Sequence, residues 1–284
     1  MESIMNGIEL FDTRLENFRE SLILGERSSA TVSKYMHDVR YFLRFLGDAL
    51  INKHEVLSYK QHLSERYTVT SANSMIAALN SFLKFVGLPE LCTKQFKVQR
   101  NAYCEEGKEL TREEYLRLVS AARMKKNERL SLVIETICAT GIRVSELKFI
   151  TLEAARKGEA WVNCKGKRRR VFIVRALCKK LIKYSKESGI TGGAIFVTKS
   201  GAPISRHSVW REMKALCRDA KVTPGKVFPH NLRHLFARTF YGVERDIAKL
   251  ADILGHASID TTRIYITTCG SEHRRKLENM RLTT

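Results

Sequence analysis

The sequence predicts a mainly α-helical protein with a small antiparallel β-sheet, in which a helical domain precedes a mixed α/β domain. Apolar residues recur at helical spacing through residues 8–86, with no alternating strand pattern. Short runs rich in β-branched and aromatic residues then occur between residues 149 and 197. A length of 284 residues is enough for two domains with a sizeable core.

The first domain is predicted to span residues 1–92 as a bundle of four helices. Gly25 ends the first helix, Gly47 the second and Gly87 the fourth. Each helix has one apolar face, which it can bury only against its neighbours. The predicted helices cover residues 8–24, the stretch between Thr31 and Gly47, residues 53–66 and residues 71–86.

Residues 93–108 are polar and basic and lose the helical period, which predicts a linker to a second domain at 109–284. The alternative is a loop inside one domain. In the second domain, Thr111 and Glu114 match a capping box that opens a helix. An apolar helix follows at 128–140 and ends at a glycine.

Short strands are predicted in the middle of the second domain. Three are expected at 149–152, 160–162 and 171–174, and an edge strand at 194–197. Residues 164–170 form a basic turn between the second and third of these strands. Further helices are predicted at 176–187, from Ser205 to Asp219 and at about 271–281.

The charge is large and uneven. The chain carries a net charge of +20. Residues 1–100 hold 13 Lys and Arg against 11 Asp and Glu, whereas residues 101–284 hold 37 against 19. Such a surplus favours a polyanionic partner, nucleic acid before a membrane. The alternative is a merely basic soluble protein.

The spacing of the cysteines and the hydropathy of the chain indicate where in the cell the protein is located. Seven cysteines are scattered, odd in number and never spaced as CxxC. This distribution disfavours zinc ribbons and disulfide frameworks and predicts a reducing, cytoplasmic location. The N-terminus has no apolar run of signal-peptide type, and no segment approaches the length of a membrane span.

Residues 228–265 hold polar side chains at positions that helices would bring together. His230 and Arg233 are one turn apart and share a helix face. His256 follows a glycine that ends the next helix, and Tyr265 lies on a short helix after it. Arginine binds phosphate with a planar fork of donors, histidine exchanges protons near neutral pH, and tyrosine can act as a covalent nucleophile. Together they suit attack on a phosphodiester.

A zinc site is the alternative for part of this stretch. His230 and His234 are spaced as zinc ligands on a helix. Asn231 stands where a metalloprotease needs its glutamate, however, and no further acidic ligand follows at useful spacing.

Two more places carry candidate residues. Arg143 follows the apolar helix at the edge of the core, where its backbone is held rigidly. A surface arginine paired with Glu146 is the alternative, and both can be true. The basic turn is suited to DNA phosphates, and a lysine at its tip could donate a proton inside a groove. A solvated charge run is the alternative. Its cations are Lys165, Lys167, Arg168, Arg169 and Arg170.

The chain resembles the tyrosine recombinase (phage integrase) family, and most of all its compact Xer-like and transposon-integrase members. Four motifs carry the resemblance in order: ATGIRVSEL at 139–147, CKGKRRRVFIV at 164–174, PHNLRHLFAR at 229–238 and LGHASIDTTRIY at 254–265. The helical half resembles the SAM-like core-binding domain of that family, so the resemblance covers nearly the whole chain. The linker lacks the prolines often seen there, and Phe236 replaces a residue that is often small.

The resemblance implies a site-specific DNA recombinase or integrase with the mixed α/β catalytic domain of the tyrosine recombinase type. The reaction would cleave and rejoin strands through a covalent 3′-phosphotyrosyl intermediate, without ATP, metal or another cofactor. The implied catalytic residues are Arg143, Lys165, His230, Arg233, His256 and Tyr265.

The implied roles follow the family pattern. Tyr265 attacks the scissile phosphate, and His230 acts as base in cleavage and as acid in the reverse step. Arg143 and Arg233 clamp the non-bridging oxygens. The remaining roles are a phosphate hydrogen bond from His256, orientation of neighbours by Glu146, and protonation of the leaving oxygen by Lys165, with Lys167 as the alternative.

The resemblance also implies partners. The substrate would be a double-stranded recombination site with inverted repeats, enclosed between the two domains. Four protomers would pair two sites, with residues 271–281 of each docked on a neighbour. The competing functions are a type IB topoisomerase, a DNA-binding regulator without catalysis, and a zinc hydrolase.

Overall fold

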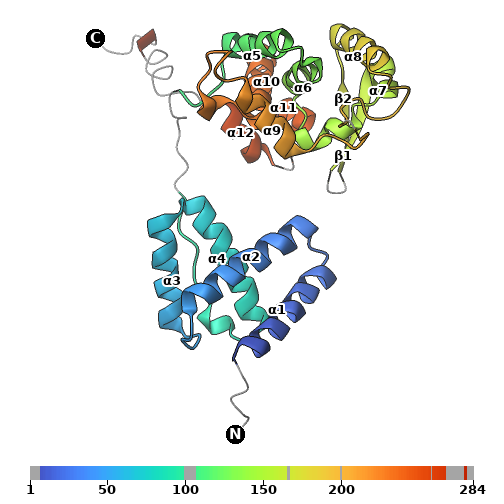
Figure 1. Ribbon diagram of the computed structural model, residues 1–284. Coiled ribbons are helices and arrows are strands. Elements are labelled where there is room, and N and C mark those ends of the chain that lie inside the picture. Colours follow the sequence, from blue (N-terminus) through green and yellow to red (C-terminus); the bar gives the residue numbers. More distant parts are fainter. Residues whose placement is uncertain are drawn as a thin grey trace. The chain divides into compact units, whose positions relative to one another are not determined.

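The computed structural model describes residues 7–98, 107–164, 167–198, 200–256, 258–266 and 278–279 (Figure 1). The chain separates into two compact units, residues 1–100 and 101–284. The predicted fold class is confirmed, because helices dominate both units and the described strands form a two-stranded antiparallel sheet.

The first unit is a bundle of four helices, as predicted. Polar side chains cap three of them, because the first N–H groups of a helix lack intrahelical partners. Ser28, Asn52 and Thr68 each accept a hydrogen bond from the backbone N–H three residues later. The helices are α1 (Gly7–Leu24), α2 (Ser29–Leu46), α3 (Lys53–Arg66) and α4 (Val69–Phe85), followed by the short 3-10 helix η1 (Pro89–Leu91).

The chain continues along α4 after η1. Asn80 Oδ1 accepts from the backbone N–H of Thr93 at 3.0 Å, and Asn80 Nδ2 donates to the Thr93 carbonyl at 2.8 Å. Asn73 makes the same pair of hydrogen bonds to Phe96, at 2.8 and 2.9 Å. Residues 93–96 of the predicted linker are therefore bound to the helical unit.

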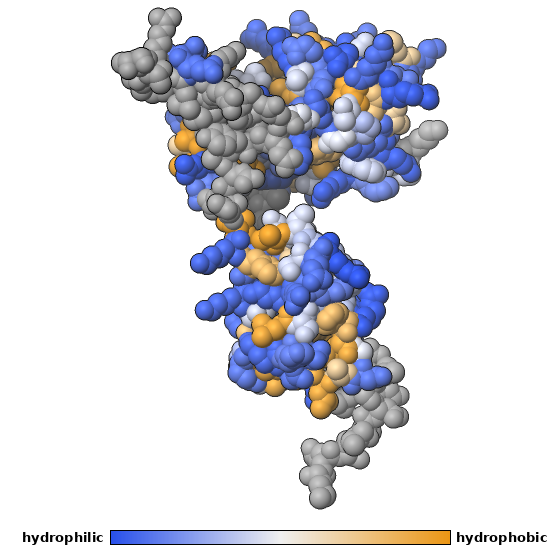
Figure 2. Space-filling model, turned by 90° about the vertical axis from the view of Figure 1, so that its left-hand side faces the viewer, coloured by the Kyte–Doolittle hydropathy of each residue, from blue (hydrophilic) through white to orange (hydrophobic). Residues whose placement is uncertain are grey.

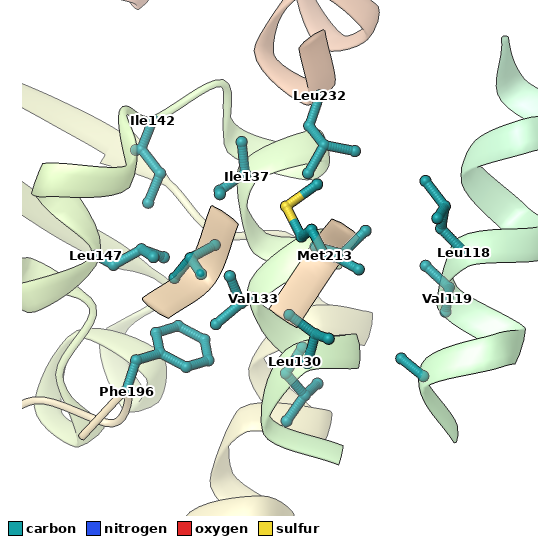
Figure 3. Close-up of a cluster of buried hydrophobic side chains, with 14 of the residues drawn as sticks. Leu118, Val119, Leu130, Val133, Ile137, Ile142, Leu147, Phe196, Met213 and Leu232 are labelled. Carbon is teal, nitrogen blue, oxygen red and sulfur yellow. The ribbon is translucent and has the colours of Figure 1, made fainter. Parts of the chain in front are cut away.

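The second unit is built around α6 (Glu128–Thr140), which is buried over most of its length (Figure 3). It packs against four other helices of the same unit. The elements of this unit are α5 (Arg112–Met124), α6, η2 (Val144–Phe149), α7 (Leu152–Lys157), β1 (Glu159–Cys164), β2 (Lys167–Phe172), α8 (Arg175–Glu187), α9 (Arg206–Ala215), η3 (Pro224–Lys226), α10 (Pro229–Glu244), α11 (Ile247–Leu254) and α12 (Ile259–Ile266).

The sheet is smaller than predicted. β1 and β2 pair with Glu159 opposite Phe172 and Cys164 opposite Lys167, so residues 167–170 are strand where a turn was expected. The strand predicted at 149–152 is wrong, because Thr151 caps α7 and makes only an isolated bridge to Ala194. The edge strand predicted at 194–197 is likewise reduced to isolated bridges.

The helix starts and ends predicted in the second unit agree with the structure better than the predicted strands do. Thr111 and Glu114 form the predicted capping box. Gly141 and Gly255 end α6 and α11 in the left-handed conformation, at φ of 65° and 67°. The helix predicted from Ser205 ends at Ala215 rather than at 219. The helix predicted at 271–281 lies outside the described residues except for positions 278 and 279.

The surface visible in Figure 2 is mostly hydrophilic, with hydrophobic residues scattered over each unit. Within the described ranges, no helix combines the length and the apolar character that a membrane crossing needs.

The close approach at Gly141 gives a test of the core. A Cβ there would lie 2.4 Å from Cδ1 of Phe236, at a φ of +65°. Gly189 has a similar φ of +68° but nothing within 4 Å of its Cβ position. We expect Gly189→Ala to cost about 1 kcal/mol of unfolding free energy and Gly141→Ala roughly 1–3 kcal/mol more.

Urea unfolding followed by tryptophan fluorescence measures this difference in the second unit alone, because Trp161 and Trp210 are the two tryptophans of the chain. Equal losses in both variants would contradict the packing of Phe236 on Gly141.

Candidate active site

A cavity of about 900 Å³ in the second unit contains three of the predicted catalytic residues, Arg143, His230 and Arg233. They come from the turn after α6 and from the first turns of α10. With Arg206 the cavity has three guanidinium groups on its walls, which suits an anion. Its remaining lining residues are Ile142, Val144, Ser145, His207, Trp210, Phe228 and Pro229.

Arg233 is 1% exposed and is held by protein acceptors. Its Nη1 donates to the Gly141 carbonyl at 2.6 Å, and its Nη2 donates to the Leu254 carbonyl at 2.8 Å. Nη2 also contacts Nε2 of His256 at 2.8 Å. Nε is buried and makes no hydrogen bond within the described part of the chain. Burial lowers the pKa of Arg233, and the neighbouring Tyr265 opposes this shift.

His256 lies between Arg233 and α12. Its Nδ1 is 2.8 Å from Oγ1 of Thr262, a residue that is 0% exposed. Burial, and then the charge of Arg233, lowers the pKa of His256 to about 4, so the ring is neutral at pH 7.

Tyr265 is buried, with 2% of its surface exposed, and its ring is surrounded by histidines. The ring centroid lies 4.3 Å from that of His234, 5.8 Å from that of His230 and 5.5 Å from that of His256. The His256 and Tyr265 rings are nearly parallel, at 14°. Tyr265 is not among the residues that line the cavity. Its phenol interacts with Arg233, a residue that does line the cavity.

His230 and His234 are in edge-to-face contact, with centroids 4.7 Å apart. Desolvation first, and then the neighbouring arginines, lowers the pKa of His230. Burial lowers the pKa of His234 to about 4. Both rings are therefore neutral near pH 7 and able to accept a proton. Among the described residues no group of three or more His, Cys, Asp and Glu side chains is arranged to hold a metal.

Glu146 is 1% exposed and joins Arg143 to the β-hairpin. Its Oε1 accepts from Arg143 Nη1 at 3.1 Å, and its Oε2 accepts from the Arg143 backbone N–H at 2.8 Å. Oε2 also accepts from Nη2 of Arg169 at 2.6 Å. Arg143 is therefore paired with Glu146, as one of the two predictions had it, although the carboxylate is buried.

Successive side chains of β2 point to opposite faces of the hairpin, so its arginines fall into two groups. Arg169 turns inward, and its Cδ packs so close to Gly255 that a Cβ there would lie 2.6 Å away. Arg168 and Arg170 turn outward and lie over the rings of Trp161 and Phe172, at 5.7 and 4.8 Å from Cζ to centroid. Arg168 and Arg170 are exposed, whereas Arg169 binds Glu146.

The two lysines of the hairpin are the residues of the predicted site that the structure does not place. Lys165 lies outside the described residues, and of Lys167 only the backbone is described, at the start of β2.

Some site residues were missed by sequence reasoning. His234 was considered only as a zinc ligand, although its place one turn after His230 puts both rings on the same side of α10. Thr262 lies one turn before Tyr265, a spacing that signals a shared helix face. Arg206 gave no local signal, because α9 reaches the cavity only through the fold.

A cavity lined by guanidinium and imidazole groups, with a tyrosine in contact with them, suits phosphoryl transfer to a protein nucleophile. Comparison with known proteins identifies the family. Residues 108–269 match the phage integrase family, and residues 15–87 match the N-terminal SAM-like domain of phage integrases.

The chain is 30% identical over 275 residues to the tyrosine recombinase XerA of Thermococcus kodakarensis, covering 93% of each chain. It is 26% identical over 291 residues to the tyrosine recombinase XerD of Halalkalibacterium halodurans, covering 93% of this chain and 94% of that one. The chain therefore belongs to the phage integrase family of tyrosine recombinases, enzymes that cleave and rejoin DNA strands.

Solved structures agree with this assignment. A crystal structure of XerA recombinase matches with a TM-score of 0.54 at 26% identity, covering 96% of this chain and 99% of that one. A lambda integrase tetramer bound to a Holliday junction matches with a TM-score of 0.70 at 21% identity, covering 90% and 76%. The resemblance stated from the four motifs is confirmed, and so is the fold class that it implied.

The buried histidines predict how stability depends on pH. His234 and His256 have pKa values of about 4 in the folded protein, below the value of about 6.5 expected in the unfolded chain. Between these values the unfolded chain binds more protons, so the free energy of unfolding must decrease as the pH falls from 6.5 towards 4.

Urea unfolding of the wild type and of His234→Gln at pH 7, 6 and 5 measures this contribution. The variant is expected to lose less stability over that range, by up to about 1.4 kcal/mol per pH unit. The same pH dependence in both proteins would show that His234 is protonated equally in the two states.

Proposed function

We propose that this chain is a site-specific DNA recombinase in which Tyr265 cleaves and rejoins strands through a covalent 3′-phosphotyrosyl intermediate. The observation that carries the proposal is the convergence of side chains from distant parts of the sequence. Arg143, His230 and Arg233 share one cavity, and Tyr265 contacts the same His230 and Arg233.

The arginines are proposed to hold the phosphate. Phosphodiester attack places growing negative charge on the non-bridging oxygens, and prearranged cations stabilise that charge. Arg143 is 37% exposed at its side chain, and Glu146 fixes it without covering it. Arg233 lines the same cavity, and its Nε–H has no hydrogen-bond partner within the described part of the chain. The two guanidinium groups could therefore grip the phosphate from two sides.

His230 is proposed as the base that activates Tyr265. A phenol with an ordinary pKa of about 10 is protonated at pH 7 and is a weak nucleophile. The lowered pKa of His230 keeps its ring neutral and able to accept the phenolic proton. In the reverse step the imidazolium returns the proton to the phenol. The phosphotyrosine bond conserves the energy of the phosphodiester, so rejoining needs no ATP.

Tyr265 is 2% exposed, so its side chain must become accessible before the phenol can attack a phosphate. A phosphate bound between Arg143 and Arg233 would compete for the guanidinium donors that His256 and Tyr265 now contact, which would release the phenol. The phenol is thereby kept away from other electrophiles until a substrate is present.

Duplex DNA with inverted repeats is the proposed substrate. The charge surplus of residues 101–284 and the outward Arg168 and Arg170 favour phosphate contacts, with Lys165 and Lys167 added from the hairpin. Similar proteins have been solved as a tetramer on a Holliday junction and on a difH substrate. We propose the same tetrameric synapsis here, with residues 271–281 docking on a neighbour. A cytoplasmic location stays a prediction from the scattered cysteines.

The nucleophile is tested with a suicide duplex nicked opposite the attacked bond, which traps the covalent complex because the cleaved end diffuses away. Wild-type protein is expected to form a protein–DNA adduct that survives denaturing electrophoresis. Tyr265→Phe keeps the buried ring, so it is expected to bind the duplex with unchanged affinity and to form no adduct. An adduct with this variant would contradict the assignment.

The choice between Lys165 and Lys167 is tested with a substrate whose leaving 5′ oxygen is replaced by sulfur. A thiolate leaves without a proton, so such a substrate does not need a general acid. Lys165→Ala is expected to slow cleavage of ordinary DNA by about 10²-fold or more and to cleave the sulfur substrate nearly normally. Lys167→Ala is expected to affect both substrates equally. If the sulfur substrate restores cleavage by Lys167→Ala and not by Lys165→Ala, Lys167 is the general acid.

A further inference from the structure

A chain of hydrogen bonds connects the helix that carries the nucleophile to the buried arginine. Thr262 is 0% exposed and lies on α12 one turn before Tyr265. Its Oγ1 is 2.8 Å from Nδ1 of His256, and Nε2 of the same ring is 2.8 Å from Nη2 of Arg233. The two ring nitrogens of His256 therefore each have one partner.

The direction of each hydrogen bond follows from what the groups can donate. A guanidinium has donors only, so Nε2 of His256 must accept from Arg233. The neutral ring then carries its proton on Nδ1 and donates it to Oγ1 of Thr262. While these two hydrogen bonds are formed, His256 has no N–H to offer a phosphate.

The proposed role of His256 requires the opposite tautomer. A hydrogen bond from His256 to a phosphate oxygen must come from an Nε2–H, because Nδ1 faces the buried Thr262. A neutral ring with Nε2–H has a lone pair on Nδ1, which then needs a donor. A threonine hydroxyl can supply one by rotation, since it both donates and accepts.

We propose that Thr262 is a positioning residue whose hydroxyl lets His256 exchange an accepted hydrogen bond from Arg233 for a donated one to the scissile phosphate. This inference rests on the proposed function of the site. The ring proton passes from Nδ1 to Nε2 by exchange with water, so the net charge does not change. The Nη2–H of Arg233 that His256 releases becomes available to the same phosphate.

The geometry explains why a hydroxyl is needed at this position. Valine has nearly the same shape as threonine but could satisfy Nδ1 in neither tautomer, and an unpaired buried polar group is costly. Serine could satisfy it in both. Thr136 provides a matched control in the same unit, because it is also 0% exposed but its Oγ1 has no hydrogen-bond partner among the described residues.

The first experiment compares Thr262→Val, Thr262→Ser and Thr136→Val in single-turnover cleavage of the nicked suicide duplex. Thr262→Val is expected to bind the duplex normally and to form the covalent adduct about tenfold more slowly, which corresponds to the loss of one hydrogen bond. Thr262→Ser and Thr136→Val are expected to stay within about twofold of the wild type. An equal rate for wild type and Thr262→Val would overturn the proposal, as would a serine variant as slow as the valine variant.

The second experiment reads the tautomer directly and does not require cleavage. Nitrogen NMR of ¹⁵N-histidine-labelled Tyr265→Phe protein is recorded without and with a half-site duplex, and His256→Gln identifies the His256 signal. We expect a protonated Nδ1 without DNA and a protonated Nε2 with DNA. A ring that keeps the same tautomer in both states would refute the inference even if Thr262→Val fails to fold.

The cleavage and NMR experiments distinguish a failure of this inference from a failure of the proposed function. Wild-type protein that forms no covalent adduct on any recombination site would remove the proposed function, whereas the tautomer without DNA would still test the hydrogen-bond chain. Adduct formation by the wild type, combined with no effect of Thr262→Val, would leave the function intact and reject the role of Thr262.

Discussion

The buried guanidinium of Arg233 is the group on which the arrangement of the site depends. A cation can be buried only if it finds acceptors, and Arg233 finds them at the ends of two helices. The Gly141 carbonyl ends α6, and the Leu254 carbonyl ends α11. Terminal carbonyls lack intrahelical partners and carry the negative end of the helix dipole. Both helix ends therefore stabilise the same charge.

This arrangement sets the positions of the other reactive groups. Arg143 follows Gly141 by two residues, and His256 follows Leu254 by two, so each is fixed by a backbone segment that Arg233 binds. Tyr265 packs against the same region from α12. Glu146 and Arg169 extend the network to the hairpin. Arg233 thus links backbone segments that lie far apart in the chain, and it fixes the residues that follow them.

The local parts of this architecture could be predicted from the sequence. The glycine stops at Gly141 and Gly255 and the capping box at Thr111 depend on chemistry within a few residues, which the sequence displays directly. The four motifs identified the family because their residue types keep a fixed order. The positions of His230, Arg233, His256 and Tyr265 were accessible for the same reason.

The errors occurred where tertiary structure decides. The apolar run at 149–152 has the composition of a strand, but Thr151 caps a helix there, and periodicity cannot separate these outcomes over four residues. Arg169 looked equivalent to Arg168 and Arg170 until the pleat of β2 turned it towards Glu146. Thr262 has no motif of its own, because its importance depends on a ring six residues away along the chain.

The central claim is that Arg143 and Arg233 hold one phosphate that Tyr265 attacks. It is tested most directly by an experimental structure of the wild-type protein trapped on the nicked suicide duplex. The account predicts a bond between the phenol oxygen of Tyr265 and a 3′ phosphorus, with both guanidinium groups on the non-bridging oxygens of that phosphate. A phosphate bound to another residue, or the two guanidinium groups on separate surfaces, would contradict it.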